Sequence, residues 1–126
     1  MNRYTVAVLV NNQFGVLNRV TSMFRRRQFN IISLTVSETE SNALSRITVT
    51  FEGGETQKQQ LVNQLYKLPD VCSIKEFTPD TSVSCELMLI KLKNDSKTRS
   101  DILAAADAFG AKTMDYSKDS LMLCLP

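Results

Sequence analysis

The sequence predicts an α+β protein in which a β-α-β-β-α-β domain is followed by a partial β-α-β-β unit of similar topology. Short stretches that alternate between apolar and polar residues predict strands, and segments with an i, i+1, i+4, i+7 apolar stripe predict helices. After a polar linker the same order of elements begins again. With 126 residues and 43% hydrophobic content, the chain can form one domain or two small ones.

The first predicted strand leads directly into the first predicted helix. Residues 4–10 carry apolar side chains on both faces, which predicts a central strand of a sheet. An amphipathic stripe follows at once and predicts a helix that ends near Gln28. The stripe consists of Val16, Leu17, Val20 and Met23.

Two alternating segments predict the next pair of strands. In residues 30–38 the positions expected to face the core are Ile32, Leu34 and Val36. In residues 44–52 they are Ile47, Val49 and Phe51, and the residues between the two segments, 39–43, predict a hairpin loop. Each strand is therefore expected to have one covered face and one polar face.

A second helix and a fourth strand complete the first domain. Gly53-Gly54 breaks the pattern, a new apolar stripe from Leu61 to Leu68 predicts a helix, and Pro69 ends it. Residues 71–77 then predict a short strand. This order of elements is typical of the ferredoxin-like fold, with two helices on one face of a four-stranded antiparallel sheet, and we assign it to residues 1–78.

The second domain is predicted over residues 79–126. A strand at 85–93, a helix that ends before Gly110, and strands at 111–117 and 120–126 repeat the first four elements. No second helix or fourth strand follows, so the sheet is expected to have an open edge and too little core. We expect this unit to be truncated, completed by a partner, or loosely ordered.

Composition excludes several classes of function. The net charge of only +2 provides no strong field for nucleic acid, and the absence of histidine removes the commonest general base and metal ligand. Three widely spaced cysteines form neither a disulfide framework nor a zinc site and are consistent with a reducing compartment. Cys72 is expected to be a small core residue. The N-terminus lacks a signal peptide or membrane span, so we expect a cytoplasmic protein without catalytic residues or a metal site.

The loop "NNQFGVL", residues 11–17, is the main candidate for function, and it allows two interpretations. In the first, Asn12 is a turn or N-cap residue and Gly15 is present for its backbone angles. In the second, the loop binds a small α-amino acid. The helix N-terminus would then receive the carboxylate and Asn12 the ammonium group. The equivalent loop of the second unit, "KNDSKTRS", has no glycine, and no matching site is expected there.

The basic run "RRRQ", residues 25–28, is expected to be a solvated helix end whose arginines suit the helix dipole. An RNA-binding module of the same topology would need aromatic residues on the exposed face of its central strands. The segment "RITVTFE" offers only Phe51, and the alternation places it on the covered face.

Four segments together carry a family resemblance. The run "VLVNNQFGVLNRVTSMFRRRQFNIISLTVSETE", then "LSRITVTFEG", "QLYKLPDVCSI" and "ELMLIKLK", resembles the regulatory (small) subunit of acetolactate synthase, also called acetohydroxyacid synthase. The resemblance extends over nearly the whole chain, and its first domain is similar to the ACT fold, an amino-acid-sensing module.

The resemblance implies a non-catalytic subunit that binds no cofactor itself. It implies a catalytic large subunit as partner, which carries thiamine diphosphate, FAD and Mg²⁺, and feedback inhibition of that enzyme by valine in branched-chain amino acid biosynthesis. It also implies a homodimer in which ACT domains pair side by side, with effector sites at the interface.

The family motif Glu-Asn-x-Pro/Ser-Gly-Val/Ala-Leu, together with Asn-Ile at the start of the next strand, implies the effector-binding residues. The matching positions are Asn12, Gly15, Val16, Leu17, Asn30 and Ile31. Three positions depart from the family pattern: Asn11 replaces Glu, Phe14 replaces Pro or Ser, and Gln28 replaces a frequent Gly. Phe14 is bulky at the rim of the expected valine site.

Three alternatives remain open. The chain could activate the catalytic subunit without sensing an effector, or act as a free-standing ACT regulator. A small enzyme of ferredoxin-like fold is the third, which the missing histidine and scattered carboxylates disfavour. The effector could also be leucine or isoleucine rather than valine.

Overall fold

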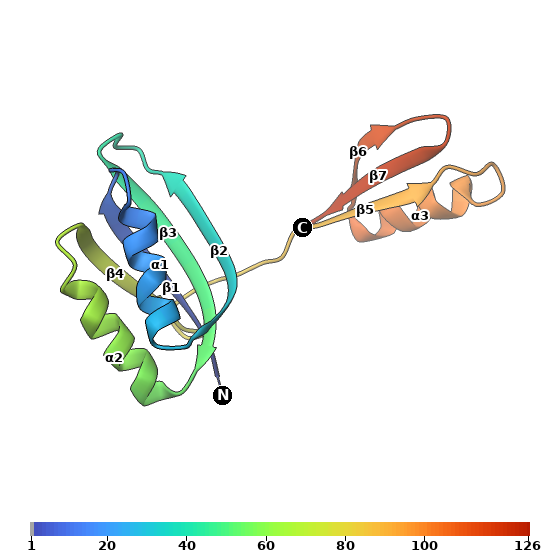
Figure 1. Cartoon of the computed structure of the whole chain (residues 1–126). Coiled ribbons are helices and arrows are strands. Elements are labelled where there is room, and N and C mark those ends of the chain that lie inside the picture. The colour runs from blue at the N-terminus through green and yellow to red at the C-terminus, as the bar shows by residue number, and fades with distance from the viewer. Residues whose placement is uncertain (1) are drawn as a thin grey trace. The chain divides into compact units, whose positions relative to one another are not determined.

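The computed structural model describes residues 2–126, which divide into two compact units with the boundary between Ser82 and Val83. The first unit contains six elements in β-α-β-β-α-β order and the second contains four in β-α-β-β order (Figure 1). The α+β prediction is therefore confirmed for both units. The predicted boundary near residue 79 lies four residues before this division.

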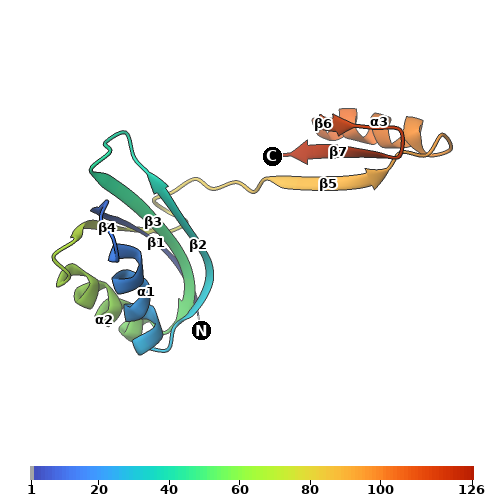
Figure 2. The same ribbon diagram turned by 45° about the horizontal axis from the view of Figure 1, so that its top comes forward.

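The first unit is a four-stranded antiparallel sheet with both helices on one face (Figures 1 and 2). The strand order is β2-β3-β1-β4, so β1 is central, as its two apolar faces predicted. The elements are β1 (Asn2–Asn11), α1 (Val16–Arg26), β2 (Asn30–Glu38), β3 (Leu44–Gly53), α2 (Glu55–Tyr66) and β4 (Val71–Phe77).

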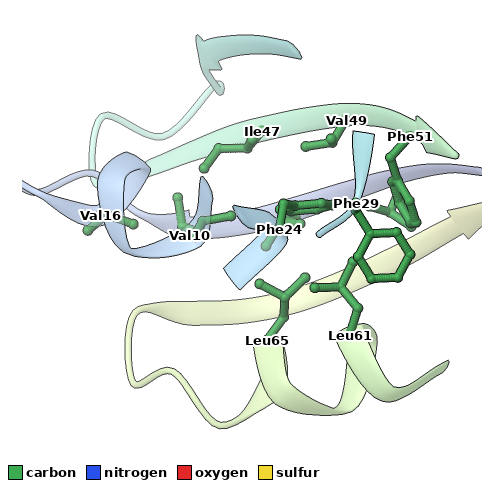
Figure 3. Packing of buried hydrophobic residues seen from close by; sticks show 12 residues of the cluster. Val10, Val16, Phe24, Phe29, Ile47, Val49, Phe51, Leu61 and Leu65 are labelled. Atoms are coloured by element: carbon green, nitrogen blue, oxygen red, sulfur yellow. The ribbon is translucent and has the colours of Figure 1, made fainter. Parts of the chain in front are cut away.

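The core of the first unit lies between the helices and the sheet (Figure 3). Three phenylalanines meet edge to face at one end, with 5.2 Å between the ring centroids of Phe24 and Phe51 and 5.1 Å between those of Phe29 and Phe51. Leu61 and Leu65 of α2 are fully buried against the same cluster. Such edge-to-face pairs add about 0.5–1.5 kcal/mol beyond the burial of their surface.

The close packing of Phe29 explains Gly53. A Cβ atom at position 53 would lie 2.3 Å from Cε1 of the Phe29 ring. Position 53, at the end of β3, therefore has room only for glycine, because the Phe29 ring occupies the space that a side chain there would need.

Strand β2 corrects one predicted position. A bulge between Ile31 and Ser33 shifts the alternation, so Ile31 pairs with Phe51 and packs against the core, while Ile32 is exposed. The prediction that Ile32 faces inward is wrong because a bulge adds a residue that strict alternation cannot anticipate. Leu34 and Val36 face the helix side as expected, but this edge strand leaves them 40% and 43% exposed.

Lys58 of helix α2 forms an ion pair and a cation–π contact with residues of the sheet. Its Nζ atom lies 2.7 Å from Oε1 of Glu76 and 3.1 Å from Oε1 of Glu55, and it sits over the Tyr4 ring. The hydrogen bond to Glu76 raises the pKa of Lys58 above its ordinary value. Lys58 is therefore charged at neutral pH although it is one of the buried residues of the first unit.

The second unit is a three-stranded antiparallel sheet with the order β5-β7-β6 and one helix. The strand predicted from residue 85 begins only at Met88. The buried apolar side chains among residues 83–126 are Ala106, Leu121 and Leu123. The elements are β5 (Met88–Lys93), α3 (Arg99–Phe109), β6 (Lys112–Tyr116) and β7 (Ser120–Leu125).

Gln28 supplies a test of backbone strain. Its φ of 58° lies in the left-handed region, which costs a residue with a Cβ atom roughly 1–2 kcal/mol. Because glycine loses about 0.5–1 kcal/mol in chain entropy, Gln28→Gly is expected to stabilise the protein by up to about 1 kcal/mol. The β-branched variant Gln28→Val is expected to lower the free energy of unfolding by about 1 kcal/mol or more. Urea unfolding measures both, and equal stability of the two variants would contradict the strain.

Candidate functional site

The loop from Asn11 to Gly15 joins the central strand to helix α1 and is fixed to two neighbouring segments. The Asn11 backbone N–H donates to the carbonyl of Asp70, between α2 and β4, at 2.9 Å. The Asn12 backbone N–H donates to the carbonyl of Ala43, in the β2–β3 hairpin, also at 2.9 Å. The loop is therefore anchored on both sides of the sheet end.

The Asn12 side chain reinforces one of these anchors. Its Nδ2 donates to the Asn42 carbonyl at 3.1 Å. Its Oδ1 accepts no hydrogen bond from any of residues 2–126. Asn12 thus works in the turn, as the first interpretation proposed, and still offers an oxygen that could accept from an ammonium group.

Helix α1 begins without a side-chain cap. Gly15 occupies the N-cap position with a φ of 80°, a left-handed conformation that glycine adopts without strain. No side chain accepts a hydrogen bond from the first turn, and no acidic residue lies in it. The Val16 N–H donates to the Gln13 carbonyl at 3.4 Å, and the N–H groups of Leu17 and Asn18 have no acceptor among residues 2–126. The helix start therefore keeps two unpaired N–H groups and a partial positive charge.

An ion pair borders the same helix start. Arg19 Nε donates to Asp70 Oδ2 at 3.0 Å, and Nη2 contacts the same oxygen. A Cβ atom on Gly15 would lie 3.2 Å from Arg19 Nη1. The sequence gives no sign of this pair, because its members are 51 positions apart and no local pattern links them.

The predicted effector residues on this loop differ in exposure. The Val16 side chain is buried in the core, so only its backbone faces the loop. The side chain of Leu17, the next residue of the helix, is 41% exposed. Phe14 is fully exposed and projects from the loop.

Asn30 and Ile31 lie at the other end of the same sheet. Asn30 pairs with Glu52 of β3, whereas Asn11 pairs with Leu44 of β3. Eight residues of β3 separate the two pairs, which is about 26 Å at ~3.3 Å per residue. One copy of the chain therefore brings Asn12, Gly15, Val16 and Leu17 together but does not add Asn30 and Ile31.

The second unit repeats the Asn12 arrangement in Asn94. The Asn94 backbone N–H donates to the Asp119 carbonyl at 2.9 Å, and Nδ2 donates to the Ser117 carbonyl at 2.7 Å. Here, however, Oδ1 accepts from Arg99 Nε at 2.6 Å. In the second loop the asparagine oxygen is therefore already occupied by Arg99, and the loop also lacks a glycine.

The cysteines and acidic residues show no catalytic grouping. Cys72 is exposed rather than buried in the core. It lies at the register shift between β1 and β4, where the pairing passes from Ser73 to Val71, so alternation along the strand does not place it in the core. Its thiol lies 3.6 Å from Asn11 Oδ1. All three cysteines are free. Within residues 2–126 no three Cys, Asp or Glu side chains gather as a metal site, and no helix is long and apolar enough to cross a membrane.

Both units match known protein families. Residues 6–73 match the AHAS small subunit-like ACT domain, and residues 85–125 match the small subunit of acetolactate synthase. The chain is 42% identical over 121 residues to the probable acetolactate synthase small subunit of Archaeoglobus fulgidus, which covers 96% of this chain and 76% of that protein. It is 44% identical over 120 residues to the acetolactate synthase small subunit of Mycolicibacterium smegmatis, covering 95% and 71%.

Solved structures agree with these matches. The crystal structure of the acetolactate synthase small subunit from Thermotoga maritima superposes with a TM-score of 0.80 at 29% identity, covering 99% of this chain and 78% of that one. The ACT domain of the GTP pyrophosphokinase from Chlorobium tepidum covers 60% of this chain with a TM-score of 0.53 at 13% identity, a likeness in fold alone.

The Arg19–Asp70 pair is testable by removing the charge of Asp70. Asp70→Asn keeps the volume of the side chain but loses a charge-assisted hydrogen bond that is partly exposed on the Arg19 side. Discounted for that exposure, the free energy of unfolding is expected to fall by about 1 kcal/mol. The difference should shrink in 1 M NaCl, because salt screens exposed charges. Chemical unfolding at low and high salt measures it, with Asp80→Asn in the linker as the control.

Proposed function

The chain belongs to the family of acetolactate synthase small subunits, and from that premise we propose that it is a non-catalytic regulatory subunit. It activates the thiamine-diphosphate-dependent catalytic subunit and makes it sensitive to feedback inhibition by valine. Thiamine diphosphate, FAD and Mg²⁺ belong to the catalytic partner. Three free cysteines suit a reducing compartment, the cytoplasm.

The observation that carries the proposal is the split location of the effector residues. Strand β2 is an edge strand, so its outer edge can pair with β2 of a second copy. In an antiparallel pairing about a two-fold axis, Asn30 of one copy lies near Glu38 of the other. Glu38 pairs with Ser45 at the hairpin end of the sheet, where Asn12 is anchored. Two copies would therefore bring all six residues to each site.

The exposed apolar side chains of this edge support the same pairing. Ile32, Leu34 and Val36 of β2 and Leu17 of α1 are each about two-fifths exposed. Pairing of two β2 edges would remove these side chains from water, at about 25 cal/mol for each Å² of apolar surface. The homodimer thus has both a hydrogen-bonding edge and an apolar flank.

The chemistry of the loop suits an aliphatic α-amino acid. The uncapped start of α1 receives the carboxylate, and Asn12 Oδ1, with Asn30 of the second copy, accepts from the ammonium group. Leu17 and Ile31 contact the aliphatic side chain. Binding favours one dimer arrangement over another and so changes the fit to the catalytic subunit.

Phe14 favours a second candidate, an activator without effector sensing. Its ring is fully exposed beside the helix start, where the family pattern has Pro or Ser. A ring that turned onto the helix start would exclude the amino acid. The two candidates differ in ligand response and agree on the catalytic partner.

Ligand binding is expected to raise the melting temperature of the chain. Valine at 100 times its Kd should add about 2.7 kcal/mol of stability, a shift of several degrees. Thermal melts with valine, leucine, isoleucine and, as control, lysine measure the response. No shift with any aliphatic amino acid, together with a shift in Phe14→Ser, would select the second candidate.

Two substitutions separate the roles of Asn12. Asn12→Ala removes the bond to the Asn42 carbonyl and the acceptor Oδ1, so it should cost about 0.5–1.5 kcal/mol of stability and most of the valine response. Asn12→Asp loses the same bond but keeps an acceptor, so it should retain the response. Both should still activate the catalytic subunit. Full valine inhibition in the Asn12→Ala complex would exclude the ligand role.

A further inference from the structure

Strand β2 carries opposite charges at its two ends. Arg25, Arg26 and Arg27 lie where helix α1 ends, just before the strand, and Glu38 and Glu40 lie where the strand ends. All five side chains are exposed, and none of them forms an ion pair within residues 2–126. The dipole of α1 accounts for arginines in its last turn but not for the two glutamates.

The charged ends flank the free edge of β2 on the helix side of the sheet. Glu38 pairs with Ser45 of β3, which is buried on the same side of that strand as Ile47. Helix α1, which ends in the arginines, packs on this side as well (Figure 2). Among residues 2–82 no strand lies beside the outer edge of β2. The edge therefore offers hydrogen-bonding groups between a basic end and an acidic end.

Such an edge is complementary to a second copy of itself. A two-fold axis through the middle of β2 reverses the strand, so the basic end of one copy meets the acidic end of the other. In the antiparallel pairing that places Asn30 near Glu38 of the second copy, two further residues bring Gln28 opposite Glu40. Arg27 then lies one position away, about 3.3 Å along the strand. The same contact occurs twice, once at each end of the paired edges.

Other arrangements of the two edges lose this match. A parallel pairing places arginines beside arginines and glutamates beside glutamates, and like charges across a strand pair are destabilising. An axis moved by one residue toward the hairpin brings Glu40 opposite Asn30. Arg27 is then three positions away, about 10 Å along the strand. The charge pattern therefore favours one orientation and disfavours a register shifted in that direction.

We propose that opposite charges align the two β2 edges, with Arg27 of each copy paired with Glu38 and Glu40 of the other. The inference rests on the proposed function, because it names the contacts that orient the homodimer and so bring Asn30 of one copy to the Asn12 loop of the second. A single exposed ion pair contributes little. Here the contact is doubled by symmetry, and the competing parallel arrangement is opposed by like charges.

Two charge reversals give a test that does not depend on either variant alone. Arg27→Glu and Glu40→Arg should each weaken the homodimer roughly fivefold or more at low salt, because both symmetric contacts become repulsive. Mixed in equal amounts, the two variants should form a heterodimer that is tighter than either homodimer, since both of its contacts join opposite charges. Sedimentation equilibrium of the full chain measures all three affinities.

A matched control is available at the end of the other helix of the first unit. Arg27 is the C-cap residue of α1 and Lys67 that of α2, and both are exposed. Lys67→Glu should change the affinity of the homodimer less than about twofold, because it lies away from the β2 edge. In 1 M NaCl the differences among the chains should shrink, because salt screens exposed charges.

The outcomes separate this inference from the function on which it rests. If the unaltered chain dimerises and both variants dimerise as tightly, or if mixing them gives no preference for the heterodimer, alignment by charge is wrong and the regulatory function stands. A misfolded chain would not gain affinity on mixing, so a folding defect cannot imitate the expected result. If the unaltered chain stays monomeric even with valine, the homodimer of the proposed function fails as well.

Discussion

The burial of strand β1 is the constraint on which the first unit depends. Val6, Val8 and Val10 are almost wholly buried beneath the helices, and both edges of the strand are hydrogen bonded, to β3 and to β4. A strand enclosed on three sides cannot shift its register without exposing its valines. The loop that leaves it is therefore presented in one position, where the hairpin and the Asp70 segment anchor it.

This anchoring determines how the candidate site can work. The Asn12 and Asn11 backbones are bonded to opposite neighbours, and the Arg19–Asp70 pair borders the helix start. Because the loop is anchored at these points, an effector that bound to it would change the conformation of the loop very little. In the proposed homodimer the variable element is the contact between two copies, because two of the six predicted effector residues, Asn30 and Ile31, lie about 26 Å from the loop within each copy.

The two units show one topology with different outcomes. Asn12 and Asn94 both join a strand–helix loop to a hairpin through a backbone N–H and a side-chain Nδ2. In the first unit the site keeps a glycine and an open Oδ1, and in the second Arg99 occupies that oxygen. The second unit instead has a groove lined by apolar residues of β5, α3 and β7.

The sequence by itself determined the elements, their order and the candidate loop, because period-2 and helical apolar patterns and the Gly and Pro breaks are local signals. It located Ile47, Val49 and Phe51 in the core, and its family resemblance named the effector positions. Tertiary structure alone decided that Ile31 rather than Ile32 packs inward, since a bulge depends on pairing with β3. It also decided that Cys72 is exposed, that Asp70 meets Arg19, and that Asn30 lies at the far end of the sheet from Asn12. These features depend on register and on contacts between distant segments, which no local pattern in the chain encodes.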